Sequence, residues 1–148
     1  MFDNLNKYSD KGSFEFKIDD SLRIVCNAPT NKSGVYIVSA QSDNTEEIIY
    51  IGSSGKKMVD GSIYIRKGKL GGIKDRIVNG KQFGDARKRS WKRRMVEEKI
   101  DHLEIKWWIT HCEAFIDCPE LIENKCQREY QKKFGSLPMW NNKFSKSQ

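Results

Sequence analysis

The chain has 148 residues, of which 37% are hydrophobic and 32% are charged, a composition that excludes the disordered classes. This length suits one domain, and we expect residues 1–148 to form it. No apolar run approaches the ~18 residues of a membrane helix, and the N-terminus lacks the apolar core of a secretory signal. The sequence therefore predicts a cytoplasmic protein without a membrane partner.

The net charge is +7, and it is unevenly distributed along the chain. Residues 56–94 contain fourteen Lys or Arg against three Asp, a net charge of +11, so the remainder carries −4. A concentrated basic segment is typical of proteins that bind a phosphate backbone. The alternative is an ordinary solvated basic surface.

Residues 13–27 contain the first periodic elements. Alternating apolar residues at 14–18 and 22–26 are separated by two aspartates. This pattern predicts a pair of strands, or one strand followed by a short turn. We assign residues 1–32 as an N-terminal extension of the domain.

Two runs rich in Val, Ile and Tyr, at residues 34–40 and 47–52, flank a polar loop and predict an antiparallel hairpin. If the numbers of paired residues sum to an even value, Tyr36 and Tyr50 emerge on the same face of the hairpin. A slip of one residue would separate them. The sequence leaves this register open.

The basic segment after the hairpin contains two predicted helices. Residues 53–69 indicate a loop or a small β excursion, and a short helix bounded by glycines follows within residues 71–80. Residues 85–100 have apolar side chains at roughly helical intervals and basic side chains on the other faces, which predicts a basic amphipathic helix. Whether this helix enters a DNA groove or only follows phosphates is left open.

Clean alternation over residues 103–109 predicts a third strand of the core sheet. Trp108 falls on the opposite face from the apolar set. It would pack in a core there or, if exposed, stack on a base.

The best-defined helix is predicted at residues 118–134. Asp117 and Glu120 suit a capping box at its start, and Gly135 follows the last apolar residue as a C-terminal cap.

Glu123 has an unusual position on this helix. At ~100° per residue it falls inside the arc formed by the helix's apolar residues, which are Ile122, Cys126, Tyr130 and Phe134. A carboxylate there is costly unless it meets a cation or a metal. Glu129 borders the same arc, so helical geometry alone does not choose between the two glutamates.

Five short motifs follow one another along the chain. They are GVY at 34–36, YIG at 50–52, GGIKDRI with Arg76, PELIE with Glu123 and LPMWN with Asn141. In these motifs and their order, residues 33–142 resemble the GIY-YIG nuclease superfamily, including its restriction-endonuclease-like branch. The resemblance implies an α+β fold: a small central antiparallel sheet of about three core strands flanked by helices, with an N-terminal β extension and a short C-terminal tail at 143–148.

Members of that family cleave phosphodiester bonds, mostly in DNA, with a divalent metal held by a single glutamate. The resemblance therefore implies one Mg²⁺ or Mn²⁺ per active site, held by Glu123. It implies that Arg76 holds the scissile phosphate, that Tyr36 is the general base and that Tyr50 bonds to the phosphate or the base. Asn141 would support the site. The motif glycines Gly34 and Gly52 would allow close backbone approach.

The sequence departs from the family in two places. Several members carry a His one turn after the Arg, where this chain has Gly80, so Lys69 and Lys74 are candidates for a phosphate-side cation. The segment between Gly52 and Arg76 is long and basic, and we expect it to contact DNA. The full set of residues predicted to bind phosphate or DNA is Lys69, Lys74, Arg87, Lys88, Arg89, Arg93 and Arg94.

The chemistry expected of these residues is coherent. Hydrolysis of a phosphodiester needs a positioned water, a proton acceptor and positive charge at the phosphoryl oxygens and the leaving group. A phenol is a poor base at neutral pH, since it ordinarily titrates near pH 10. Nearby cations would favour its ionised form. This would explain a tyrosine base within the most basic part of the chain.

The first hypothesis is therefore a metal-dependent endonuclease acting on double-stranded DNA. A restriction-type enzyme is favoured because no separate DNA-binding domain follows residue 144, and cutting both strands predicts a homodimer or higher oligomer. A phage, mobile-element or structure-specific repair nuclease stays open. Two alternatives are a nucleic-acid-binding module without turnover, and a small zinc protein using His111, Cys112, Cys118 and Cys126.

Overall fold

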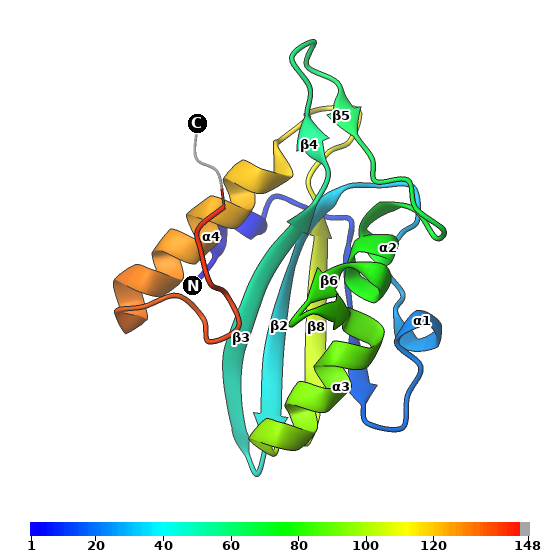
Figure 1. The fold of residues 1–148 in the computed structure, drawn as a ribbon. Helices are drawn as coiled ribbons and strands as arrows, with labels where there is room; N and C mark the ends of the chain where they lie inside the picture. The colour runs from blue at the N-terminus through cyan, green and yellow to red at the C-terminus, as the bar shows by residue number, and fades with distance from the viewer. Residues whose placement is uncertain (146–148) are drawn as a thin grey trace.

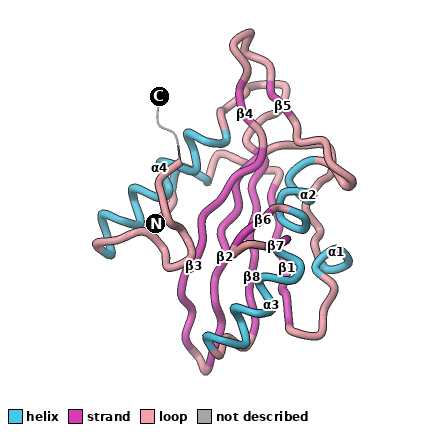
Figure 2. The backbone as a smooth tube through the Cα atoms, viewed as in Figure 1, coloured by secondary structure: helices cyan, strands magenta, loops and turns pink. Residues whose placement is uncertain are grey.

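The computed structural model describes residues 1–145, which form an α+β fold around a four-stranded antiparallel sheet (Figures 1 and 2). The sheet has the order β1-β8-β2-β3, from strands Lys11–Lys17, His102–Ile109, Gly34–Ser42 and Thr45–Ser54. The helices are η1 (Asp3–Leu5), α1 (Leu22–Val25), α2 (Gly72–Asn79), α3 (Arg87–Glu98) and α4 (Pro119–Phe134). The predicted fold class, three core strands with an N-terminal β addition, is confirmed at the level of α+β and an antiparallel sheet.

Two small hairpins complete the fold. Strands β4 (Lys56–Lys57) and β5 (Ile63–Tyr64) pair in a hairpin that projects beyond the sheet at the top of Figure 1. Strands β6 (Lys81–Gln82) and β7 (Asp85–Ala86) pair between α2 and α3. The excursion predicted between the YIG motif and the next helix is thus partly β structure.

The two faces of the sheet bury two separate cores. Helices α1, α2 and α3 cover one core, which contains Phe16, Trp91 and Leu103, and α4 with η1 covers the other, which contains Val35, Ile37 and Ile122. Both faces of β2 are therefore buried, a state in which a strand reads as a continuous apolar run. Trp108 packs partly buried against the second core.

The register of the β2–β3 hairpin puts the two motif tyrosines on the same face. Tyr36 pairs with Gly52 and Tyr50 pairs with Val38, so the numbers of the paired residues sum to an even value. A bulge follows Val38, and a two-residue turn reverses the chain. The prediction that Tyr36 and Tyr50 share one face of the hairpin is therefore confirmed.

The N-terminal segment differs from one of its predicted forms. Residues 11–17 form β1 as expected, but residues 22–25 form the single helical turn α1 instead of a second strand. Leu22 and Cys26 are buried four residues apart, the spacing of one helical turn, whereas Ile24 is 79% exposed. Apolar alternation over so short a stretch does not distinguish a strand from a helical turn.

Residues 1–32 are packed into the rest of the domain. Leu5 and Tyr8 lie in the core under α4, and β1 pairs with β8 along its full length. The predicted extension therefore contributes to the same cores as residues 33–142. Of the predicted tail at 143–148, residues 146–148 lie outside the described residues.

Helix α4 begins at Pro119 and ends before Gly135, whose φ of 85° suits a glycine cap. The predicted capping box is wrong. The N-cap is Cys118, with no side-chain cap, because the Asp117 carboxylate accepts a hydrogen bond from Tyr8 at 2.7 Å and also pairs with a lysine near the N-terminus.

Within the described residues, no helix combines the length and apolar character needed to cross a membrane.

Candidate functional site

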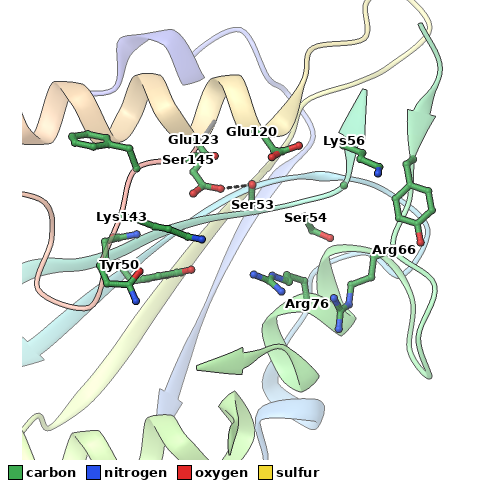
Figure 3. Close-up of a pocket in the computed structure, with 15 residues that line it drawn as sticks. Tyr50, Ser53, Ser54, Lys56, Arg66, Arg76, Glu120, Glu123, Lys143 and Ser145 are labelled. Atoms are coloured by element: carbon green, nitrogen blue, oxygen red, sulfur yellow. Dashed lines mark hydrogen bonds between the residues drawn. The ribbon is translucent and has the colours of Figure 1, made fainter. Parts of the chain in front are cut away.

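A cleft of about 580 Å³ opens where the end of β3, the start of α4, helix α2 and residues 141–145 meet (Figure 3). Its charged lining side chains come from segments far apart in the sequence: Lys56, Arg66, Arg76, Lys143, Glu120 and Glu123. Four cations thus face two carboxylates. Such a cleft suits an anionic ligand together with a cation bound at the carboxylates.

The structure brings five residues of the predicted site together. Tyr50, Arg76, Glu123 and Asn141 line the cleft. Tyr36 lies beneath it with no exposed surface, and its ring centroid is 6.1 Å from that of Tyr50. The phenol predicted to act as the base is therefore closed off from the cleft in this conformation, while the second phenol reaches it.

Glu123 projects from α4 into the cleft, as the helical arc predicted. One carboxylate oxygen accepts a hydrogen bond from the Ser53 hydroxyl, and the other accepts one from Gln127 Nε2 at 2.9 Å. Burial raises the pKa of Glu123 to about 7, although Ser53 and the charge of Arg76 act in the opposite direction. The neighbouring groups therefore compensate only part of the cost of burying this charge.

Glu129, the other glutamate at the border of the arc, lies away from the cleft. Its carboxylate accepts a hydrogen bond from the backbone N–H of Phe2. It therefore holds the N-terminus against α4. Of the two glutamates that helical geometry left open, Glu123 is the one that lines the cleft.

The carboxylates of the cleft fit a divalent metal held mainly by water and substrate oxygens. The described residues contain no group of three His, Cys, Asp or Glu side chains able to form a closed metal cage. Mg²⁺ is commonly bound by one or two carboxylates together with waters and phosphate oxygens. Glu123 supplies a poorly compensated carboxylate, and Glu120 lines the cleft one helical turn away.

The residues of the zinc alternative do not gather into a metal site within the described chain. His111 Nε2 accepts a hydrogen bond from the Ser33 N–H, so this nitrogen is already engaged. Cys112 is exposed, whereas Cys126 is buried in the core under α4. Nothing in this arrangement favours zinc.

Arg76 lies beside the hydroxyl of Tyr36 at the base of the cleft. Tyr36, followed by Tyr50 and Glu123, raises the pKa of Arg76 above its ordinary value, although burial opposes the shift. Its guanidinium therefore provides a permanent positive charge next to both phenols.

Arg87 occupies a position that the sequence did not predict. Its side chain is 1% exposed, and its guanidinium donates hydrogen bonds to the hydroxyls of Tyr36 at 2.6 Å and Tyr50 at 3.1 Å. The expectation that Arg87 binds DNA at the surface of the basic helix is wrong, because its side chain is buried against Tyr36 and Tyr50. Arg87 is the first residue of α3. Burial raises the pKa of Tyr50 well above its usual range, and Arg87 opposes that shift.

The other predicted DNA-binding residues lie outside the cleft lining. Lys69 and Lys88 are exposed, and Lys74 is half-buried on α2. Arg89 and Arg93 both pair with Asp85, and Arg94 pairs with Glu97 and Glu98 at the end of α3. Their contact with DNA stays a prediction. The sequence did not single out Lys56, Arg66 and Lys143 as cleft cations. Lys56 and Arg66 lie in the basic segment that was expected to contact DNA, and Lys143 stands two residues after Asn141.

Asn141 joins the C-terminal segment to the edge of the sheet. Its side chain accepts a hydrogen bond from the Ile51 N–H and donates one to the Ile51 carbonyl, both at 2.9 Å. The Trp140 N–H donates to the Ile49 carbonyl at 2.8 Å. These bonds hold the wall of the cleft against β3, beside Tyr50.

Comparisons with known proteins found no match. No family model, no curated protein and no solved structure matches the chain. The function of this protein is therefore inferred from its motifs and from the geometry of the cleft.

Both motif glycines sit where a side chain would collide with a neighbour. A Cβ at Gly34 would lie 2.0 Å from the Trp108 carbonyl oxygen on β8. A Cβ at Gly52 would lie 2.6 Å from Tyr36 Cζ and 2.6 Å from Tyr50 Cε2. The absence of a side chain at Gly52 thus lets the two phenol rings lie together on the hairpin.

We expect Gly52→Ala to displace both phenol rings and to destabilise the protein by roughly 1–3 kcal/mol, because the added methyl group overpacks a filled space. Near-ultraviolet circular dichroism would report the tyrosine environment, and chemical denaturation would report the stability. Gly61→Ala is the control, since a Cβ there meets nothing within 4 Å and only its φ of 88° is unfavourable. An unchanged near-ultraviolet spectrum in Gly52→Ala would contradict the ring contact.

Asp75 links α2 to the loop that precedes it, residues 65–71. Its carboxylate is 2% exposed and accepts hydrogen bonds from Arg66 Nε at 2.6 Å, Asn79 Nδ2 at 2.8 Å and the Leu70 N–H at 3.1 Å. Burial alone would raise the pKa of Asp75, but these hydrogen bonds outweigh it and hold the pKa below its ordinary value. Asp75 therefore fixes the guanidinium of Arg66 at the cleft.

We expect Asp75→Asn to lower the free energy of unfolding at pH 7 by about 2–4 kcal/mol, since it removes the buried anion that pairs with the half-buried Arg66 side chain. Because the folded-state pKa is lowered, the stabilisation by Asp75 is present above about pH 4 and is lost at lower pH. Urea denaturation of both proteins at pH 7 and pH 3 checks this. A difference that stays constant down to pH 3 would refute the charge-based explanation.

Proposed function

We propose that this protein is a metal-dependent DNA endonuclease of the GIY-YIG type, which hydrolyses phosphodiester bonds. The observation that carries the proposal is that Tyr50, Arg76 and Glu123 line one cationic cleft, with Tyr36 packed directly beneath it. These residues come from four elements, β2, β3, α2 and α4. The sequence motifs that suggested the family supply all four of them.

Arg76 would bind the scissile phosphate and stabilise the negative charge that develops on it. Its guanidinium lies at the base of the cleft, and Lys56, Arg66 and Lys143 add positive charge around the opening. In a site with little water, such fixed charges stabilise a phosphoryl transition state strongly. The Ser53 hydroxyl and Gln127 amide would orient Glu123.

Tyr36 would accept the proton of the attacking water. Arg76 and Arg87 both adjoin its hydroxyl, where negative charge would develop when the phenol loses its proton. Tyr50 is the phenol that reaches the cleft, but burial raises its pKa, and its hydrogen bond from Arg87 is longer, at 3.1 Å against 2.6 Å for Tyr36. For Tyr36 to act, water must reach its hydroxyl, which has no exposed surface in this conformation, so binding of DNA would have to open a path to it.

The metal expected at this cleft is Mg²⁺ or Mn²⁺, held by Glu123 and approached by Glu120. When bound, it would supply Lewis-acid stabilisation of the phosphoryl oxygens and the leaving group.

Double-stranded DNA is the proposed substrate. The projecting β4–β5 hairpin and the exposed basic residues near the cleft offer positive charge to its backbone (Figure 1). Restriction-type cleavage of both strands would involve a homodimer or a higher oligomer. A role in a phage, in a mobile element or in repair, and the cytoplasmic location, stay predictions.

A nucleic-acid-binding module without turnover is the second candidate. The complete burial of Tyr36 favours this candidate, because a general base must contact the water that it activates. The cationic lining of the cleft would serve binding equally well.

Incubation with supercoiled plasmid and with linear genomic DNA, in Mg²⁺, Mn²⁺ or EDTA, tests the proposal. We expect metal-dependent cleavage, with discrete bands if the enzyme is sequence-specific. DNA that is retarded in a gel but uncut in every metal would support the binding module. Because the cleft and its surroundings carry many cations, we expect affinity to fall steeply as the salt concentration rises.

A further inference from the structure

Arg87 is a cation enclosed in the protein without a carboxylate partner. Its side chain is 1% exposed, and no ion pair among the described residues includes it. A buried arginine costs folding free energy unless its charge and its donors are matched. The neighbours of this guanidinium must therefore explain its position.

Those neighbours are the residues of the proposed active site. Nη1 donates to the Tyr36 hydroxyl at 2.6 Å and to the carbonyl oxygen of Arg76 at 2.8 Å, and Nη2 donates to the Tyr50 hydroxyl at 3.1 Å. One planar group thus links both phenols to the backbone of α2. The guanidinium carbon lies 5.6 Å and 5.2 Å from the centroids of the two tyrosine rings.

A fourth hydrogen bond of Arg87 fixes the orientation of the guanidinium. Its Nε donates to Gln82 Oε1 at 3.0 Å, and the same oxygen accepts a hydrogen bond from Trp91 Nε1 at 2.9 Å. Gln82 is held on β6, and Trp91 lies fully buried in the core. The guanidinium is therefore locked in one plane before any ligand binds, which a lysine ammonium could not reproduce.

We propose that Arg87 is a positioning residue, which holds the phenols of Tyr36 and Tyr50 side by side and supplies the countercharge when Tyr36 gives up its proton. This inference rests on the proposed nuclease function. It assigns a partner for the developing charge in a chain that has Gly80 where several family members carry a His. Arginine stays protonated throughout, so Arg87 stabilises charge and transfers no proton.

Other charged or titratable groups face the two phenols from each element packed against them. Arg76 lies on α2, Glu123 lies on α4, and the phenols face each other from β2 and β3. Arg76 adjoins the cleft and can engage a phosphate, whereas Arg87 is sealed beneath it. Arg87 is therefore the cation whose charge stays available to the phenols when DNA occupies the site.

The test is an absorbance titration of tyrosine at 295 nm in metal-free protein, which needs no nuclease activity. In Arg87→Met we expect tyrosine ionisation to move to higher pH than in the wild type, because both phenols lose their hydrogen-bonded cation. Because Arg87 also donates to Tyr50, part of this difference should persist when Arg87→Met is compared with its parent in a Tyr36→Phe background, and the part that is lost belongs to Tyr36. An unchanged titration would overturn the proposal.

Arg87→Lys provides the second variant, and it decides the question if Arg87→Met does not fold. Lysine keeps a positive charge but lacks the fork that reaches both phenols, so we expect most of the titration to be restored. Its single-turnover cleavage rate should fall on the order of tenfold with unchanged DNA affinity, since Arg87 does not reach the surface. A loss of DNA affinity with an unchanged rate would overturn the positioning role.

The two proposals fail in distinguishable ways. If the wild type cuts no DNA in any metal but Arg87→Met shifts the tyrosine titration, the nuclease function fails and the electrostatic link between Arg87 and Tyr36 stands. If the wild type cuts DNA and neither the titration nor the rate changes in the Arg87 variants, the nuclease function stands and the positioning role fails.

Discussion

Glu123→Gln is expected to lower the rate of DNA cleavage on the order of 10³-fold or more, because it removes the carboxylate proposed to hold the metal. The same substitution is expected to stabilise the metal-free protein at pH 8. The amide retains the size of the glutamate, and it can donate to Ser53 and accept from Gln127. Opposite effects on activity and stability would distinguish a functional residue from one needed for folding.

The stability gain follows from the pKa of Glu123, which burial raises to about 7 in the folded protein. An unfolded glutamate titrates near pH 4.3, so folding favours its protonated form. The contribution of Glu123 to stability is therefore full below about pH 4 and is lost as the pH rises through about 7. At pH 8 the glutamine variant should be more stable by roughly 3 kcal/mol, since each unit of difference between the folded and unfolded pKa corresponds to about 1.4 kcal/mol.

Urea denaturation in EDTA at pH 4 and pH 8 measures this difference, and single-turnover cleavage in Mg²⁺ measures the activity. Added Mg²⁺ should stabilise the wild type and leave Glu123→Gln unchanged. Glu113→Gln is a matched control, since Glu113 is exposed outside the cleft. Cleavage by Glu123→Gln at the wild-type rate would refute the assignment of the metal ligand.

Tyr36→Phe is expected to reduce the cleavage rate by about 10²–10⁴-fold, the usual contribution of a general base. DNA affinity should be retained, because Tyr36 has no exposed surface. The substitution also leaves Arg87 Nη1 with one acceptor fewer, so we expect a loss of stability of about 1–3 kcal/mol. Rates are therefore best measured well below the melting temperature.

Tyr50→Phe removes the corresponding oxygen from the neighbouring ring and is the matched comparison. We expect a smaller effect on the rate, because Tyr50 receives the longer of the two Arg87 hydrogen bonds, 3.1 Å against 2.6 Å for Tyr36. If Tyr50→Phe loses more activity than Tyr36→Phe, the base is the phenol that lines the cleft. If both variants cleave as the wild type does, neither phenol takes the proton.

The local features of the fold could be predicted because their signals are short in range. Helix α4 was expected from its Pro and Gly boundaries, and Glu123 was expected to face inward from the helical period. The hairpin register could not be derived, because both faces of β2 are buried and the alternation that would select a face is lost. The bulge after Val38 also shifts the pairing by one residue in the rest of the hairpin, where Ser39 pairs with Ile48.

The features that could not be predicted depend on residues far apart in the chain. Arg87 stands in a run of basic residues and has the sequence context of a solvated side chain, yet its acceptors Tyr36 and Tyr50 come from 51 and 37 residues away. Asp117 fits a helix cap by spacing, but Tyr8, 109 residues distant, occupies its carboxylate. Helical spacing contains no information about such partners.

The attachment of Asn141 to Ile51 has a consequence for assembly. An outer strand with free N–H and C=O groups can recruit a strand from another molecule, and this pairing leads to aggregation. Here the side-chain amide of Asn141 occupies both groups of Ile51, and the Trp140 N–H occupies the carbonyl of Ile49. The stretch of β3 that presents Tyr50 is thereby shielded from pairing with a strand of a second copy, which keeps this side of the cleft open to its ligand.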